Sequence, residues 1–269
     1  MLLKVRAAAS YELSVETFLC LMVEPPLIGP GYRVMEERLM TSPTLSCDLR
    51  TDLYGNTQRL LTAPSGPFSF EFTAEIEVAA NQPIPPDAIE QPPQQIRPDV
   101  MHYTLPSRYC QSDLLTRMAT SEFGQLAPGG GRVIAIAEWV RKHVEYRYGT
   151  TDAKTSAFDT ATERIGVCRD FAHLMIAFCR ALGIPARYAS GYALDLDPPD
   201  FHGFVQVYLG GEWHNVDATT EGLRPALVPI AVGRDAADVA MVTTWVTHTL
   251  ISQYVEVGRV VAPAVALAQ

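Results

Sequence analysis

The stretch that decides the fold covers residues 166–185 and reads GVCRDFAHLMIAFCRALGIP. Apolar residues recur in it every three or four positions, which predicts a helix from about Cys168 to Leu182. One apolar stripe consists of Phe171, Met175, Phe178 and Leu182, and a second consists of Ala172, Ile176 and Cys179. Gly183 and Pro185 then end the helix in the usual order. Because the apolar face is so wide, we expect this helix to be buried at the centre of its domain.

The segments around this helix predict an α+β organisation. Upstream, Ser112 is placed to cap a helix that ends near Phe123, and an amphipathic run follows from Arg132 to about Tyr146. Downstream, four segments have the pattern of strands: Ala186–Ala193, Phe204–Leu209, Trp213–Val216 and Gln253–Val257. A central helix followed by an antiparallel sheet is typical of the α+β class.

The first 80 residues have the pattern of an antiparallel β-domain. Residues 68–78 alternate between apolar and polar side chains, which is the period of a strand with one buried face. Residues 52–56 (DLYGN) form a turn signal between two short strand-like segments and predict a hairpin. No helical period persists before residue 80, so we predict an antiparallel sheet or sandwich over residues 1–80.

A proline-rich segment, residues 81–104, separates this β-domain from the rest of the chain. Six prolines lie between Asn81 and Pro98 and leave too few backbone donors for a helix or a central strand. The composition favours an extended, semi-rigid linker between two domains, and a long surface loop within one domain is the alternative. The prediction is therefore a β-domain (1–80), a linker (81–104) and an α+β domain (105–269).

The composition sets broad limits on compartment and partners. Of the 269 residues 48% are hydrophobic, enough for a substantial core, and the net charge of −9 disfavours nucleic acid and anionic membranes as partners. Five cysteines, an odd number, argue against a disulfide scaffold and leave at least one free thiol. With no signal-peptide pattern and no apolar stretch long enough to span a membrane, we expect a cytoplasmic protein with reduced thiols.

Cys168 lies where the central helix begins, and this position favours a nucleophilic thiol. Free backbone N–H groups and the positive end of the helix dipole favour a thiolate there. The same groups, including the Cys168 N–H, are placed to stabilise an oxyanion. A buried, inert core cysteine is the alternative. Cys179 lies about 16 Å further along the helix axis and His173 about 140° around it, so we expect a core cysteine and a helix-surface histidine.

We expect the base and the acid for this thiol to come from the strands that follow. His202 begins one strand and Asp217 ends the next, with a Gly210-Gly211 turn between them. In an antiparallel hairpin this turn places Asp217 opposite about residue 204, within side-chain reach of His202. Such a thiol, histidine and acid would form a nucleophile, a base and a group that orients the base. His214 is a rival base, but it lies nearer the turn and away from the acid.

Several motifs occur in a recognisable order along the chain. They are residues 166–173 (GVCRDFAH), 183–188 (GIPARY), 190–192 (SGY), the His202 segment with Trp213, 217–219 (DAT) and 231–235 (AVGRD). In this order they resemble the bacterial transglutaminase-like superfamily, and residues 52–56 resemble part of the β-domain that often precedes its core. The resemblance implies a papain-like α+β fold, a catalytic domain over residues 105–269 and a Cys168–His202–Asp217 triad.

Three positions depart from the family pattern without removing a triad group. Phe204 stands where the family usually has Trp, and Gly203 and Ala218 replace the more usual Ala and Pro. The change at Phe204 would alter an aromatic wall near the site. Phe204 and Trp213 are therefore the candidates for lining a substrate pocket.

The resemblance and the chemistry of these residues predict acyl transfer through a thioester. Cys168 would attack a carboxamide of the glutamine type, so the expected partners are a protein or peptide substrate and an amine acceptor. With water as acceptor the same triad would make a cysteine peptidase or amidase, and a catalytically silent interaction module is the third hypothesis. We expect no metal and no cofactor, because the acidic loop at residues 195–200 lacks the glycine and the terminal glutamate of an EF-hand.

Overall fold

The first 78 residues form strands and loops, as their alternation predicts. The computed structural model, which describes residues 1–260, contains β1 (Leu2–Leu13), β2 (Thr17–Leu21), β3 (Ile28–Gly29), β4 (Tyr32–Ser42), β5 (Asp48–Thr51), β6 (Thr57–Ala63) and β7 (Gly66–Val78) in this part. Every second residue of β7 from Phe68 to Val78 is buried. β5 and β6 form the predicted hairpin, with Thr51 paired to Thr57 across the turn.

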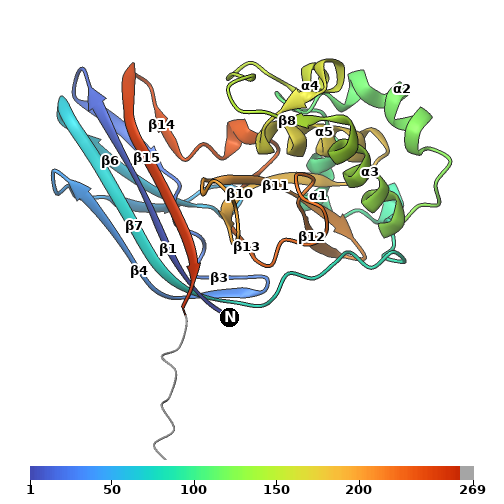
Figure 1. Cartoon of the computed structure of the whole chain (residues 1–269), viewed down its shortest axis with the longest axis horizontal. Coiled ribbons are helices and arrows are strands. Elements are labelled where there is room, and N and C mark those ends of the chain that lie inside the picture. Colours follow the sequence, from blue (N-terminus) through green and yellow to red (C-terminus); the bar gives the residue numbers. More distant parts are fainter. Residues whose placement is uncertain (261–269) are drawn as a thin grey trace, which may run out of the picture.

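Two antiparallel sheets pack these strands together with two strands from the other end of the chain. Their orders are β15-β1-β7-β4-β3 and β14-β2-β6-β5. β15 (His248–Arg259) pairs with β1 along its length, and β14 (Val242–Thr244) pairs with β2. Figure 1 shows β15, in red, beside β1, in dark blue.

This pairing corrects one prediction. Residues 242–259 do not belong to the α+β half, and Gln253–Val257 is part of the sandwich rather than of the sheet that follows the central helix. The physical reason is that alternation identifies the buried face of a strand but not its neighbour in space. The rest of that predicted unit, residues 261–269, lies outside the described residues.

The middle of the chain forms the α+β half. Its helices are α2 (Ser112–Phe123), α3 (Gly130–His143), α4 (Ala157–Glu163) and α5 (Cys168–Ala181). A short parallel pair is formed by β8 (Glu145–Tyr146) and β9 (Ile165–Gly166). The sheet has the order β12 (Glu212–Val216), β11 (His202–Leu209), β10 (Ala186–Ala193) and β13 (Leu227–Gly233). α5 contacts β10 and β11 as well as α2, α3 and α4 (Figure 1). Every residue from Asp170 to Arg180 is buried, so α5 is the predicted central helix. Ser112 begins α2 but does not cap it, since Gln111 holds the cap position.

Residues 79–104 cross between the halves as a packed segment. No helix or strand forms as far as Pro92; η1 (Pro93–Gln95), α1 (Pro98–Met101) and η2 (His102–Thr104) follow. The Ala88 carbonyl accepts a hydrogen bond from Gly130 N–H at the start of α3, where a side chain on Gly130 would overlap the Pro85 carbonyl. The glycine run at 129–131 therefore permits a close backbone crossing.

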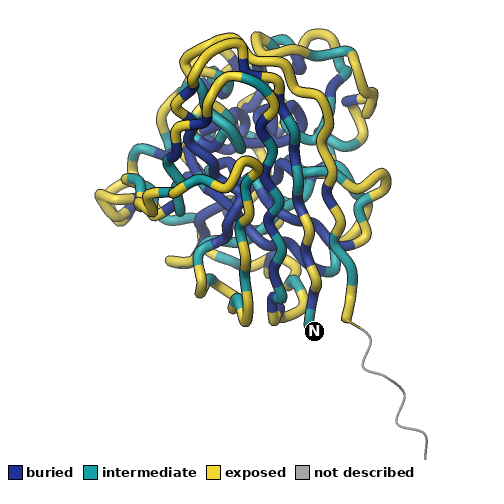
Figure 2. The backbone as a smooth tube through the Cα atoms, turned by 90° about the vertical axis from the view of Figure 1, so that its left-hand side faces the viewer, coloured by how far each residue is buried: buried dark blue, intermediate teal, exposed yellow. Residues whose placement is uncertain are grey.

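The sandwich and the α+β half share one hydrophobic core. Buried residues of both halves belong to a single contact cluster, and Figure 2 shows buried backbone in the interior with exposed loops around it. The Asn56 side chain of the β5–β6 turn bonds both backbone groups of Val232 on β13, each at 2.8 Å. The Tyr192 hydroxyl donates to the Val23 carbonyl at 2.7 Å. These contacts fix the two halves relative to each other.

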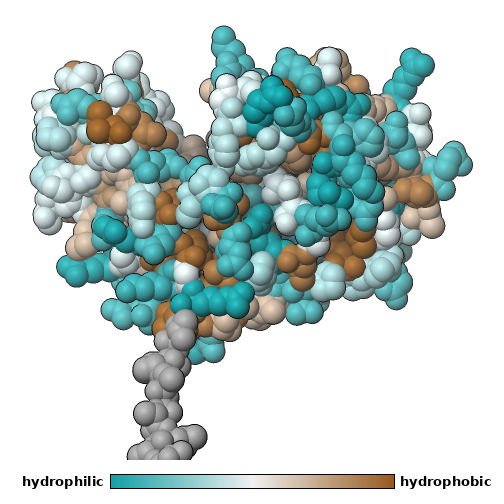
Figure 3. Space-filling model, viewed as in Figure 1, coloured by the Kyte–Doolittle hydropathy of each residue, from teal (hydrophilic) through white to brown (hydrophobic). Residues whose placement is uncertain are grey.

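The surface mixes polar and apolar residues. On the face shown in Figure 3, hydrophobic side chains lie in small patches among hydrophilic ones. No helix within residues 1–260 is long and apolar enough to cross a membrane.

Candidate active site

Cys168 is the first residue of α5, and the turn before it is tightly held. The Asp170 carboxylate accepts a hydrogen bond from Val167 N–H at 3.0 Å and thereby caps the helix. Asp170 is fully buried and also accepts from the Thr151 hydroxyl at 2.8 Å. A side chain at Gly166 would collide with Asp170, so glycine is required there. The thiol of the partly exposed Cys168 is thus presented at a rigid helix start.

The β11–β12 hairpin brings His202 and Asp217 together. Gly210 and Gly211, with φ of 61° and 96°, form the turn, and Val205 pairs with Val216. This register places Asp217 beside the start of β11, as the sequence predicts. His202 Nε2 lies 2.7 Å from Asp217 Oδ2, and both side chains are buried.

The environment favours an imidazolium on His202 and a carboxylate on Asp217. Burial lowers the pKa of His202, but the hydrogen bond with Asp217 and the interaction with the Cys168 thiol outweigh it and raise the pKa to about 9. Burial raises the pKa of Asp217, but hydrogen bonds from His202, Thr219 and Arg224 hold it well below its usual value. The pair is therefore charged at neutral pH.

The other ring nitrogen of His202 is free for chemistry. Nδ1 is buried and has no hydrogen-bond partner among residues 1–260. Asp217 holds Nε2, and the Cys168 thiol lies close enough to the ring to contribute to its raised pKa. The structure thus brings together Cys168, His202 and Asp217, with Nδ1 as the nitrogen left to exchange a proton with the thiol or a substrate.

Two contacts of Asp217 are not predicted from the sequence, one from Thr219, which was quoted only as part of the DAT motif, and one from Arg224. Thr219 donates to Asp217 Oδ1 from its backbone N–H at 3.0 Å and from its hydroxyl at 2.7 Å. Arg224 donates from Nε to Asp217 Oδ2 at 2.7 Å. The Asp-x-Thr spacing is a turn signal that could have identified Thr219. Arg224 lies in an irregular loop, where no spacing rule points to it.

The structure places the two pocket candidates in different surroundings, and their role in a substrate pocket stays a prediction. Phe204 is only 1% exposed, and its ring stacks beside that of His202 with centroids 6.4 Å apart, so it supports the histidine rather than lining a surface. Trp213 lies four residues before Asp217, about 13 Å along the strand, and packs under the Arg187 guanidinium at 4.0 Å.

A Cβ at Gly203 would overlap the Tyr188 hydroxyl, which explains the absence of the usual alanine.

His173 is also misplaced by the sequence analysis. It is fully buried, its Nε2 accepts a hydrogen bond from Ala236 N–H at 3.1 Å, and its ring stacks on Tyr109. Burial lowers the pKa of His173 well below its ordinary value. The expectation of a surface position was wrong because neighbouring elements cover α5 on every side.

The acidic loop before His202 makes contacts within the protein. Asp200 Oδ1 accepts from Gln253 Nε2 at 2.7 Å, and Asp195 lies 3.6 Å from the Arg259 guanidinium. Within the described part of the chain, no group of three or more His, Cys, Asp or Glu side chains is arranged to hold a metal ion.

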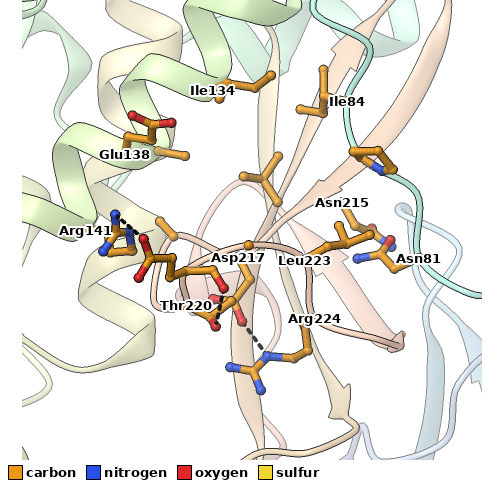
Figure 4. A pocket seen from close by; sticks show the side chains of 16 residues that line it. Asn81, Ile84, Ile134, Glu138, Arg141, Asn215, Asp217, Thr220, Leu223 and Arg224 are labelled. Carbon is orange, nitrogen blue, oxygen red and sulfur yellow. Dashed lines mark hydrogen bonds and ion pairs between the residues drawn. The ribbon is translucent and has the colours of Figure 1, made fainter.

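A cavity of about 320 Å³ lies beside Asp217, and its lining includes neither Cys168 nor His202. Ile84 of the 79–104 segment, Ile134 and Arg141 of α3, and the 215–224 segment line it. Figure 4 shows Arg224 bonded to Asp217 at its lower edge. Asp217 and Arg224 are thus part of the wall of this cavity.

Comparison with known proteins identifies relatives. The model of the transglutaminase-like superfamily matches residues 117–218. A crystal structure from Cytophaga hutchinsonii, named as a "putative cysteine protease", is 37% identical with a TM-score of 0.90, and the match covers 98% of this chain and 92% of that one. The uncharacterized protein ML0607 of Mycobacterium leprae is 38% identical over 120 residues, 40% of this chain and 42% of its own length. Rv2569c of Mycobacterium tuberculosis is 36% identical over 120 residues, which are 39% of this chain and 38% of its own length. The chain thus spans about two fifths of the length of these curated relatives.

Proposed function

The chain belongs to the transglutaminase-like superfamily, and from that premise we propose that it transfers an acyl group from a carboxamide of the glutamine side-chain type to an amine, through a thioester on Cys168. At the coarser level the fold and its relatives make it a cysteine-dependent acyltransferase or protease. The observation that carries the proposal is the state of His202: Asp217 holds Nε2, and Nδ1 is buried with no hydrogen-bond partner in the part of the chain that the structure describes.

The first half of the reaction forms the thioester. Cys168 Sγ attacks the carbonyl carbon, and the oxyanion that forms accepts a hydrogen bond from the Cys168 N–H at the start of α5. His202 then gives its Nδ1 proton to the amide nitrogen, the carbon–nitrogen bond breaks, and ammonia leaves. Asp217 stabilises the imidazolium throughout.

The second half releases the product. An amine attacks the thioester carbonyl, neutral His202 takes the proton from the attacking nitrogen, and the thiolate of Cys168 leaves. The acyl group ends on the amine as a new amide, Cys168 Sγ is free again, and His202 once more carries the proton on Nδ1. No oxidant, metal or cofactor takes part in this sequence.

Hydrolysis is the second candidate, and the relative from Cytophaga hutchinsonii favours it. That protein bears the name of a cysteine protease, and water in place of the amine would give a peptidase or amidase with the same three residues. A catalytically silent interaction module is the third candidate. We propose a protein or peptide as the acyl donor and, because the five cysteines are free thiols, a cytoplasmic location.

One assay separates the three candidates. The full chain is incubated with a glutamine-containing peptide and dansyl cadaverine, and both amine incorporation and release of free acid are followed by mass spectrometry. We expect amine incorporation that iodoacetamide abolishes and that Cys168→Ser lacks, with Cys179→Ser as the matched control because its thiol is buried in the core. Free acid alone would establish hydrolysis, and an unreactive Cys168 thiol would leave the interaction module.

A further inference from the structure

We propose that Arg224 is a positioning residue of this site: its guanidinium holds the Asp217 carboxylate in place and, by partly neutralising it, sets the pH range over which His202 keeps its proton. The inference rests on the proposed function only for the roles of Asp217 and His202. It gives a task to a residue beyond the segment, 117–218, that matches the family model.

The first support is the geometry around one oxygen atom. Asp217 Oδ2 accepts from Arg224 Nε and contacts His202 Nε2, each at 2.7 Å. The two nitrogens are therefore at most about 5.4 Å apart. The side chains of Arg224 and Asp217 are 9% and 3% exposed, so solvent and salt screen this arrangement only weakly.

The second support is that the loop after β12 is built around the carboxylate. Thr219 occupies Asp217 Oδ1, which leaves Oδ2 to Arg224 and His202. Arg224 also donates from Nη1 to the Asp195 carbonyl at 3.1 Å and so connects this loop to the one that precedes His202. Figure 4 shows the arginine reaching Asp217 from the loop. Two bonds in different directions fix the guanidinium in one orientation.

The electrostatic consequence has a definite sign. His202 faces Asp217 from the end of β12 and Cys168 from α5; Asp217 faces His202, Thr219 and Arg224. Removing the charge of Arg224 leaves the full negative charge of Asp217 to act on the imidazolium, so the pKa of His202 must rise. Asp217 stays ionised at neutral pH, because His202 and Thr219 still bond it.

The test measures the pKa of His202 directly and needs no turnover. Full-length protein labelled with ¹⁵N-histidine is titrated by NMR in a Cys168→Ser background, so that the thiol does not titrate together with the ring. The His202 signal is the one that disappears in His202→Gln. For Arg224→Gln we expect the His202 pKa to rise by about 2 pH units, the effect of a unit charge about 5–6 Å away at an effective dielectric constant of about 20.

Three further variants are titrated in the same way. Arg224→Lys keeps the positive charge near Asp217, so the His202 pKa in this variant should stay within about 0.5 pH unit of its value in the parent protein. Thr219→Val removes a neutral hydrogen bond from the same carboxylate and should have a smaller effect than Arg224→Gln. Arg224→Met, which keeps an apolar stem in the cavity, replaces Arg224→Gln if the latter does not fold.

Two outcomes would overturn the proposal: an unchanged His202 pKa in the neutral variants of Arg224, or an equal rise in Thr219→Val. A different measurement, the activity assay, tests the proposed function. A wild-type protein that neither incorporates amine nor hydrolyses the peptide would refute that function, while the His202 titration would still report on Arg224.

Discussion

Replacing Asp217 with asparagine tests the charge pair at the centre of the site. The amide keeps the shape of the carboxylate but removes the negative charge that faces His202 Nε2 at 2.7 Å. The wild-type pKa of His202 is about 9, against an ordinary value of 6.5. At 1.36 kcal/mol per pH unit, this difference corresponds to about 3 kcal/mol in favour of the imidazolium.

Without the aspartate, the remaining surroundings disfavour a charged ring. Burial lowers the pKa of His202, and the Arg224 guanidinium would then face it without a counter-charge. We therefore expect a pKa of 6.5 or below in Asp217→Asn. With a pKa of 6.5, the imidazolium fraction at pH 8 falls from about 90% to about 3%, and at pH 6 from nearly 100% to about 75%, by the ordinary titration relation; a lower pKa deepens both losses.

The readout is kcat/KM for the peptide substrate at these two pH values. We expect Asp217→Asn to lose at least about twentyfold more activity at pH 8 than at pH 6, because the ring loses its proton far more completely at the higher pH. Asp159→Asn is the matched control, since this carboxylate caps α4 through Ser156 and does not touch the triad. An equal loss at both pH values would refute the electrostatic role of Asp217 and leave only a steric one.

Two further predictions concern the scaffold. Asn56→Ala leaves both backbone groups of Val232 without the side chain that bonds them, so we expect a loss of about 2–4 kcal/mol in the free energy of unfolding, measured with urea. Asn81→Ala is the control, and an equal loss of stability in the two variants would contradict the role of Asn56. Gly203→Ala drives a methyl group into the Tyr188 hydroxyl and should cost about 1–3 kcal/mol. In a double-mutant cycle this cost should shrink in a Tyr188→Val background, and an unchanged cost would rule out the proposed overlap.

The parts of the fold that the sequence predicts are those set by local periodicity. α5 follows from the spacing of its apolar residues, and the register of His202 against Asp217 follows from a two-glycine turn. Both depend on residues close together in the chain, so elementary helix and hairpin geometry suffices.

What the sequence does not predict depends on which distant segments meet. β15 reads as a strand but carries no information that its neighbour is β1, more than 200 residues away. His173 would be a surface residue on an isolated helix and is buried only because other elements cover α5. Arg224 lies in a loop without any period, and its place beside Asp217 results from the path of the whole 217–226 segment.

β15, the strand whose sheet the sequence does not predict, also supports the site. The loop that leads into His202 is bonded on two sides: Gln253 of β15 donates to Asp200, and Arg224 donates to the Asp195 carbonyl. The Asp200 carboxylate in turn accepts from Phe201 N–H, directly before His202. Because β15 is itself paired along β1, the position of His202 is tied to the sandwich through this loop. The β-sandwich therefore supports the candidate site, in line with the single hydrophobic core that the two halves share.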